Sequence, residues 1–302
     1  MDKYAIQINN LNKIYNNGYQ ALNGINLNIK QGTIFGLLGP NGAGKSSLIN
    51  ILSGVSVKTS GAIKIFGYDF DQDPIKSKYL IGIVPQEIAL DTFFNVYDAL
   101  EFYAGYFGIR SKDRKTSQIM QAVHLSKVAG STPRMLSGGM KRRLLIAKAM
   151  VHSPKILILD EPTAGVDIEL RDQLWEYVLE LKAQGTTIIL TTHYLAEAEK
   201  LCDEIAFIDK GRIIHCDQKE NLINTLGSKK MIIECDQIDP IKLASFPNIA
   251  VQDNAKLAIN FNANQNINQL LSDILNLGVN IKNIQIERDD LESIYKRYIQ
   301  HH

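Results

Sequence analysis

The chain has 302 residues, which allows one large domain or two domains with a real hydrophobic core. Its 33 Lys and Arg against 32 Asp and Glu give a net charge of +1, so no nucleic acid is expected as a partner. The apolar runs are far shorter than the ~18 residues of a membrane-spanning helix, and Met1-Asp2-Lys3 does not open a signal sequence, so we expect a cytoplasmic protein.

Residues 4–8 and 25–29 alternate apolar with polar side chains, which predicts two half-buried strands. Tyr15 lies between them, where an aromatic ring could stack on a nucleotide base. An ordinary strand tyrosine is the alternative, and Tyr19 is the rival for the stacking position. The next predicted strand, 33–38, is apolar throughout and therefore buried.

Residues 39–46 fit the phosphate-binding pattern G-x-x-x-x-G-K-[ST] and lie between that strand and a helical run. They read Gly39-Pro40-Asn41-Gly42-Ala43-Gly44-Lys45-Ser46. The glycines let successive N–H groups turn inward on an anion at a helix N-terminus, whose dipole adds about half a positive charge. In this pattern Lys45 reaches the phosphates and the Ser46 hydroxyl ligates Mg²⁺. A glycine-rich turn that matches by chance is disfavoured by the strand and helix on either side.

The middle of the chain places a polar amide and a helical region after further strands. Residues 61–66 alternate, and the buried run 80–84 ends at Pro85-Gln86. Helices are predicted over 95–128, where aromatic residues are dense: Phe93, Phe94, Tyr97, Phe102, Tyr103, Tyr106 and Phe107. We expect most of these rings in the core, with a partner groove as the alternative.

Two further strand ends and one helix start carry candidate site residues. Ser137-Gly138-Gly139 opens an amphipathic helix through Met150, with Ser137 as a cap and exposed N–H groups for an anion. The apolar strand 156–159 ends in Asp160-Glu161. Asp160 is the natural Mg²⁺ partner of the Ser46 site, and Glu161 can orient or deprotonate an attacking water. A helix over 168–183 and a strand over 186–191 precede His193, which alone would be read as structural.

Five elements in this order resemble the ATP-binding cassette (ABC) ATPases: GPNGAGKS, VPQ, LSGG, ILILDE and TTH. The resemblance covers about residues 1–220 and implies an ATPase. It implies ATP binding by the first motif with Ser47, by the aromatic Tyr15, and by the signature residues Ser137, Gly138 and Gly139. It further makes Gln86 a contact of Mg²⁺ or water, Glu161 the catalytic base and His193 the switch histidine. Asp167 in Ala164-Gly165-Val166-Asp167 matches the D-loop.

The sequence departs from the family's commonest signature at Met140, where Gln is usual, which puts side-chain contacts from that position in doubt. LSGGMKRR, DEPTAGVD and TTHYLAEAEKLCDEIA resemble the subunits of ABC-2 type exporters. That resemblance implies a separate membrane permease of about six spans, a second ATP-binding subunit in a homodimer, and a location at the inner face of the membrane. A soluble ABC ATPase acting on ribosomes or nucleic acid, and a phosphate-loop kinase or GTPase, are the alternatives.

The composition changes from about residue 228, where asparagine becomes frequent. Strands are predicted at 230–235, 256–261 and 281–287, with helices near 266–277 and 290–300. The ending Asp289-Asp290-Leu291-Glu292-Ser293-Ile294-Tyr295 resembles the tail of ABC-2 subunits, which implies dimer contacts or regulation; a stabilising cap is the alternative.

Cys202, Cys216 and Cys235 form no C-x-x-C pair, so reduced thiols are expected. The predicted fold is therefore α/β: a phosphate-loop domain of ABC type over 1–220, an inserted helical subdomain at about 87–155, and a small C-terminal α+β domain over 228–302.

Overall fold

The computed structural model describes residues 3–164, 168–235, 249–253, 256–261, 267–276 and 280–300. The chain divides into two compact units, Met1–Asp217 and Gln218–His302. The domain limits expected from the sequence remain predictions. No helix within the described ranges combines the length and the apolarity of a membrane span.

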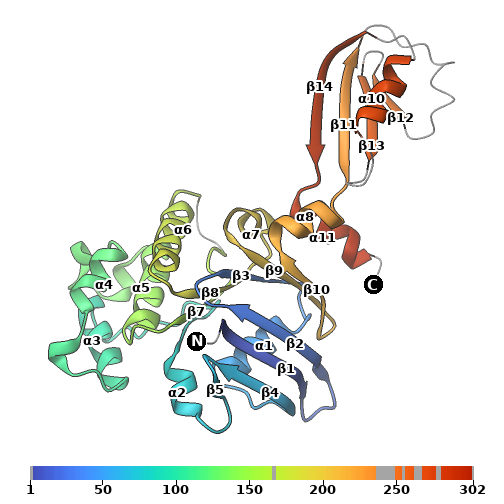
Figure 1. Ribbon diagram of the computed structural model, residues 1–302. Helices are drawn as coiled ribbons and strands as arrows, with labels where there is room; N and C mark the ends of the chain where they lie inside the picture. Colours follow the sequence, from blue (N-terminus) through green and yellow to red (C-terminus); the bar gives the residue numbers. More distant parts are fainter. Residues whose placement is uncertain are drawn as a thin grey trace. The chain divides into compact units, whose positions relative to one another are not determined.

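An antiparallel sheet opens the first unit, and its strands run in the order β2-β1-β4-β5 (Figure 1). The strands are β1 (Tyr4–Ile14), β2 (Gln20–Lys30), β4 (Ser60–Ile65) and β5 (Tyr68–Asp69). In β1, Ile6 and Ile8 are buried and Gln7 between them is only partly buried, as alternation predicts for a sheet with one covered face. The two strands expected here are thus confirmed and extend further than the alternation alone showed.

The second sheet of this unit has the strand order β10-β9-β3-β8-β7-β6. Its strands are β3 (Ile34–Leu38), β6 (Ile81–Val84), β7 (Ile156–Asp160), β8 (Thr187–Thr191), β9 (Glu204–Asp209) and β10 (Arg212–Gln218). All pairs from β9 to β6 are parallel. β3 and β8 are buried at every residue because both faces of the sheet are covered. The carboxyl ends of these strands therefore meet at one edge.

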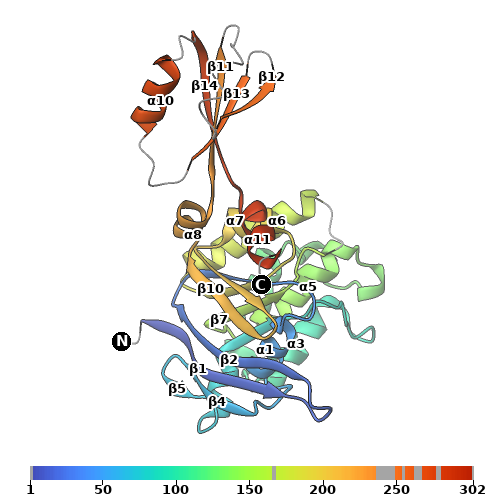
Figure 2. The ribbon, with the colours of Figure 1, turned by 90° about the vertical axis from the view of Figure 1, so that its right-hand side faces the viewer.

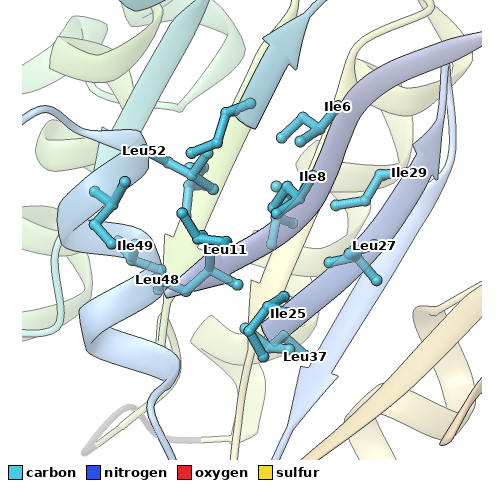
Figure 3. Close-up of a cluster of buried hydrophobic side chains, with 14 of the residues drawn as sticks. Ile6, Ile8, Leu11, Ile25, Leu27, Ile29, Leu37, Leu48, Ile49 and Leu52 are labelled. Carbon is cyan, nitrogen blue, oxygen red and sulfur yellow. The ribbon is translucent and has the colours of Figure 1, made fainter. Parts of the chain in front are cut away.

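Helix α1 (Lys45–Leu52) packs between the two sheets and completes the main core. Figure 3 shows Leu48, Ile49 and Leu52 from the helix facing the apolar side chains of β1 and β2. The apolar spacing of the helix places these residues on one side, as its sequence predicts. This packing fixes where the helix begins, and hence where the loop before it lies.

The other helices of the unit are α2 (Pro74–Tyr79), α3 (Val96–Tyr106), α4 (Thr116–Ala122), α5 (Gly138–Met150), α6 (Ile168–Ala183) and α7 (Leu195–Leu201), with short 3-10 turns at Ser111–Asp113, Ser126–Val128 and Pro133–Met135. Helices α3, α4 and α5 lie together beside the sheets (Figure 1) and bury a separate apolar cluster. Val96, Leu100 and Leu144 in that cluster are fully buried.

The expectation that most aromatic residues of 93–107 lie in the core is wrong. Phe93 is 92% exposed, Tyr106 79%, Phe102 56% and Tyr97 42%, and the other three rings are only partly buried. The cluster under α3 is filled by aliphatic side chains instead. Tyr103 and Phe107 pack against this cluster from its edge, and Phe94 and Phe102 stack on each other with ring centroids 5.2 Å apart.

In the second unit, four antiparallel strands form a sheet in the order β12-β13-β11-β14 (Figure 2). They are β11 (Lys229–Cys235), β12 (Ile249–Asp253), β13 (Lys256–Phe261) and β14 (Ile281–Arg288), and the helices are α8 (Lys219–Leu226), α10 (Ile267–Asn276) and α11 (Leu291–Gln300). Met231, Ile233 and Ile259 form its core with Leu271 of α10. The expected α+β character is confirmed, although β12 was not predicted.

The three cysteines carry free thiols, and Cys202 and Cys235 are buried. Across the described part of the chain, no cluster of three or more His, Cys, Asp or Glu side chains is arranged to hold a metal ion.

Candidate functional site

The predicted site residues follow four neighbouring parallel strands at their carboxyl edge. The phosphate-binding loop follows β3, Gln86 follows β6, Glu161 follows β7 and His193 follows β8. This edge is where ligands bind in open α/β sheets, because the loops of several strands converge there.

Glycine is required at several positions of the loop 39–46. Gly42 and Gly44 have φ values of 81° and 111°, a region that side chains disfavour. A Cβ at Gly44 would lie 2.7 Å from the Ala21 carbonyl, and one at Gly39 would lie 2.3 Å from the Ile208 carbonyl. Gly44 begins α1 without a side-chain cap, so the loop presents backbone N–H groups at the helix start. The loop geometry therefore fits a phosphate.

Lys45 is the buried cation of this loop, with only 7% of its surface exposed. Its Nζ donates to the Gly39 carbonyl at 2.6 Å and to the Pro40 carbonyl at 3.0 Å. Burial lowers the pKa of Lys45, and the charges of Glu161 and Asp160 oppose that effect. The ammonium is thus held over the loop and near two carboxylates.

Two tyrosines and two serines complete the loop's surroundings. Ser46 is exposed at the start of α1, and the Ser47 hydroxyl lies 3.1 Å from the Tyr15 hydroxyl. The Tyr19 hydroxyl donates to the Gly42 carbonyl at 3.3 Å. The structure therefore places both candidate stacking rings beside the loop. Tyr15 contacts Ser47 of α1, whereas Tyr19 contacts the loop itself at Gly42.

The carboxylate of Glu161 contacts two of the other predicted residues, Gln86 and His193. Its Oε2 accepts from Gln86 Nε2 at 3.0 Å and lies 3.2 Å from His193 Nδ1. The Glu161 side chain is 11% exposed, and its backbone has a φ of 45°, which is rare for a residue with a side chain. The Glu161 carboxylate therefore lies at the carboxyl edge of the sheet, in contact with Gln86 and with His193.

Thr191 is a site residue that the sequence reasoning missed. Its hydroxyl donates to Asp160 Oδ1 at 2.5 Å, and Glu161 N donates to the same hydroxyl at 3.1 Å. The signal lay in the topology, because the register of the parallel strands pairs Asp160 with Thr191. A threonine at the end of one parallel strand can therefore indicate a partner for an aspartate at the end of the neighbouring strand.

The start of α5 is not joined to these groups. Ser137 caps the helix by accepting from Met140 N at 3.3 Å, as predicted. A Cβ on Gly138 would meet no atom within 4 Å, so this helix start faces open space. Ser137, Gly138 and Gly139 make no hydrogen bond to the loop or to Glu161 within the described ranges. Asp167 lies outside the described residues.

Known proteins match both the sequence and the fold. The family model described as "ABC transporter" matches residues 22–164. The chain is 35% identical over 301 residues to the linearmycin resistance ATP-binding protein LnrL of Bacillus subtilis, with 96% of each chain covered. The chain belongs to the ABC transporter family. It is an ABC ATPase and binds ATP.

Other similar proteins support this membership. The ABC ATPase is 35% identical to the Nod factor export ATP-binding protein I of Cupriavidus metallidurans, covering 78% of this chain and 79% of that protein. Among solved structures it is similar to cbiO1 of Clostridium perfringens, with a TM-score of 0.67, 30% identity and coverage of 73% and 91%. It is also similar to the dimeric cassette MJ0796 bound to ADP and Pi, with a TM-score of 0.64, 25% identity and coverage of 71% and 98%.

Proposed function

We propose that this ABC ATPase hydrolyses ATP at the carboxyl edge of its parallel sheet to energise export through a separate membrane permease. The backbone amides of 39–46 and the Lys45 ammonium would hold the phosphates, with Ser47 beside them. Tyr15 would stack on the base. The observation that carries the proposal is the Glu161 carboxylate, which Gln86 and His193 hold at the end of β7.

In this proposal Glu161 takes a proton from the attacking water, which must lie in line with the terminal phosphate. Gln86 fixes the carboxylate through its amide and would contact the metal or the water. His193 holds the same carboxylate from the other side and would steady the phosphate. The three side chains come from loops after three different strands, so a change at the phosphate reaches all three loops.

The donor set also fits Mg²⁺. This ion keeps several waters and takes few protein oxygens, so the lack of a larger acidic cluster in the described chain is compatible with it. Ser46 and Asp160 would hold it, with Gln86 nearby. When bound, the ion neutralises phosphate charge. Thr191 orients the Asp160 carboxylate by donating to its Oδ1.

The test of this site is Glu161→Gln, which keeps the shape of the side chain and removes its basicity. We expect ATP binding to persist and steady-state turnover to fall by about 10²-fold or more. The matched control is Glu176→Gln on the exposed face of α6, which should hydrolyse ATP normally. Normal turnover by Glu161→Gln at saturating ATP and Mg²⁺ would show that Glu161 is not the catalytic base.

The export role is supported by the names of the relatives, which speak of Nod factor export and linearmycin resistance. A surface for the permease is available on the same unit. A groove of about 700 Å³ lies between α2, β6, α3 and α5, and Ile75, Tyr79, Tyr103, Tyr106 and Phe107 are among its lining residues. Ile75 is 82% exposed, and Tyr106 is 79% exposed. Exposed apolar surface of this kind marks an interaction site.

The chemistry of the groove indicates what it would accept. His152 forms part of its lining, with its ring stacked on Phe107 at a centroid distance of 3.9 Å. Lys78 and Lys148 also line it, and the Lys148 ammonium lies 4.0 Å from the Tyr103 ring centroid. We propose that the groove binds a cytoplasmic segment of the permease that combines an apolar anchor with an acidic side chain. The permease would be of ABC-2 type with about six spans.

This assignment is tested with a photo-crosslinking side chain at Tyr106 in cells that make the protein. The matched control carries the crosslinker at Phe93, which is 92% exposed but does not line the groove. We expect Tyr106 alone to crosslink to a chain with about six membrane spans. Crosslinks to ribosomal proteins or nucleic acid would favour the soluble alternative instead.

A further inference from the structure

Arg142 is a buried cation that the proposed hydrolysis does not use. It lies on α5, is 2% exposed, and takes part in none of the ion pairs of the described residues. Burying a guanidinium is costly unless its donors are satisfied. Burial lowers the pKa of Arg142, and the nearby Asp160 and Glu161 charges oppose that effect.

The donors of Arg142 are satisfied by backbone carbonyls from two loops of the site. Nη1 donates to the Pro85 carbonyl at 2.6 Å and to the Gln86 carbonyl at 3.1 Å. Nε donates to the Pro162 carbonyl at 2.6 Å. Nη2 donates to the Glu161 carbonyl and, at 3.4 Å, to the Asp160 carbonyl. The rigid guanidinium therefore spans the ends of β6 and β7 at once.

The contact to Glu161 occurs where the backbone is strained. Glu161 has a φ of 45° and precedes a proline, and both features restrict its conformation. Its N–H donates to the Thr191 carbonyl at 3.0 Å and to the Thr191 hydroxyl at 3.1 Å. Its own carbonyl accepts from the Arg142 guanidinium and, at 3.2 Å, from the Ala164 N–H. Strained residues persist only when their surroundings hold them. Arg142 supplies one of these hydrogen bonds, and it is the one that comes from α5.

We infer that Arg142 is a positioning residue that sets the backbones of Gln86 and Glu161 so that their side chains meet. It does so from the helix that Ser137 caps and Gly138 begins, so it also connects the signature motif to the catalytic base. The inference rests on the proposed role of Glu161. A movement of α5 would be passed to both loops through this one side chain.

The test is Arg142→Lys in the full-length chain, because lysine keeps the charge but is a point donor that cannot span both loops. We expect kcat per bound nucleotide to fall by about 10²-fold, since small misplacements of catalytic groups cost that much. The Kd for ATP should stay within about twofold, because the hydrogen bonds of Arg142 go to residues 85–86 and 160–162 and none goes to the loop 39–46. The matched control is Arg143→Lys, because among the described residues the Arg143 guanidinium donates to a single acceptor, the Val123 carbonyl at 3.4 Å.

A double-mutant cycle separates positioning from simple loss of structure. Added to Glu161→Gln, the Arg142→Lys change should lower the residual turnover by much less than the ~10²-fold expected without that mutation, because one of the two groups that Arg142 positions is already disabled. A merely structural arginine would lower residual turnover and ATP affinity alike. Undiminished kcat in Arg142→Lys, or an equal loss in the Glu161→Gln background, overturns the inference. Normal turnover by Glu161→Gln alone would instead overturn the proposed function.

If Arg142→Lys does not yield folded protein, two other measurements decide. Arg142→Gln, assayed per bound nucleotide at reduced temperature, should show the same split between kcat and Kd. In the native protein, amide exchange at 86–89 and 161–164 should report opening together with α5, since one side chain holds both segments. Independent opening of the two segments from the helix overturns the inference.

Discussion

At the residue scale, Lys45 shows how a buried charge can be kept for a ligand. Its ammonium is almost fully buried, and its two closest acceptors are carbonyls of its own loop, Gly39 and Pro40. Carbonyls satisfy the donors without neutralising the charge, so the positive charge of the loop is preserved for an anion. Burial lowers the pKa of Lys45, and an arriving phosphate would favour the charged form again.

The corresponding prediction is that Lys45→Ala loses ATP affinity and turnover together. The ammonium would contact phosphate oxygens in the bound state as well as in the transition state, and removing one such group costs about 10²-fold. The measurements are ATP Kd and kcat/KM on the full chain. Lys64→Ala on the exposed side of β4 is the control and should match the native protein. Unchanged binding and hydrolysis in Lys45→Ala would mean that residues 39–46 do not hold the phosphates.

The sequence was enough to predict the side chains that meet at Glu161, but not the residues that hold those side chains and their loops in place. Gln86, Glu161 and His193 could be placed because each follows an apolar run that reads as a buried strand. Thr191 and Arg142 could not, because their roles depend on strand register and on how α5 lies against the sheet. Such contacts join residues that are distant in the sequence, and no local pattern specifies them.

At the scale of elements, the helical subdomain is held together by more than its apolar cluster. Glu101 on α3 accepts from Arg114 Nη1 at 2.6 Å and from the hydroxyl of Thr116, which begins α4. The hydrogen bond from Thr116, aided by Arg114, lowers the pKa of Glu101 from its ordinary value of 4.5. A half-buried carboxylate thus joins two helices of the subdomain.

We predict that Glu101→Gln destabilises the subdomain by about 1–2 kcal/mol at pH 7. Because the folded carboxyl has the lower pKa, its contribution is present above the ordinary value of 4.5 and is lost as the pH falls through the folded pKa. The difference between variant and native protein should therefore shrink in acid. Amide exchange of α3 and α4 at several pH values measures it.

The control for that experiment is Asp113→Asn, which removes the exposed ion pair between Asp113 and Arg110. Their side chains are 46% and 74% exposed, so little stability should be lost. A Glu101→Gln difference that grew on acidification, or that equalled the control at pH 7, would contradict the proposed role of this carboxylate.

The aromatic stretch shows why elements are easier to predict than their faces. The helices between 95 and 128 could be predicted, and α3 and α4 lie there. The burial of their rings could not, because a density of aromatic residues has no period that selects one side of a helix. Tyr106 and Phe107 instead line the groove, where an exposed ring can serve a partner.

At the scale of the whole molecule, one phosphate-binding loop is matched by one signature helix. Both present N–H groups at a helix start, and both suit the same anion. Within the described chain these two helix starts make no hydrogen bond to each other, and Gly138 faces open space. We therefore predict that each ATP site is shared between two subunits, with residues 39–46 of one facing Ser137–Gly139 of the other. A two-fold dimer would contain two equivalent sites.

The prediction is tested by mixing two inactive variants, Lys45→Ala and Gly138→Asp. The second should fold normally, because no atom lies within 4 Å of a Cβ at Gly138, while its carboxylate would repel an incoming phosphate. In the mixed dimer one interface carries both lesions, and the other pairs an unmodified loop with an unmodified signature. Shared sites therefore predict that nucleotide occlusion reappears on mixing. If each subunit completed its own site, every site would carry a lesion, so a confirmed mixed dimer without occlusion would contradict sharing.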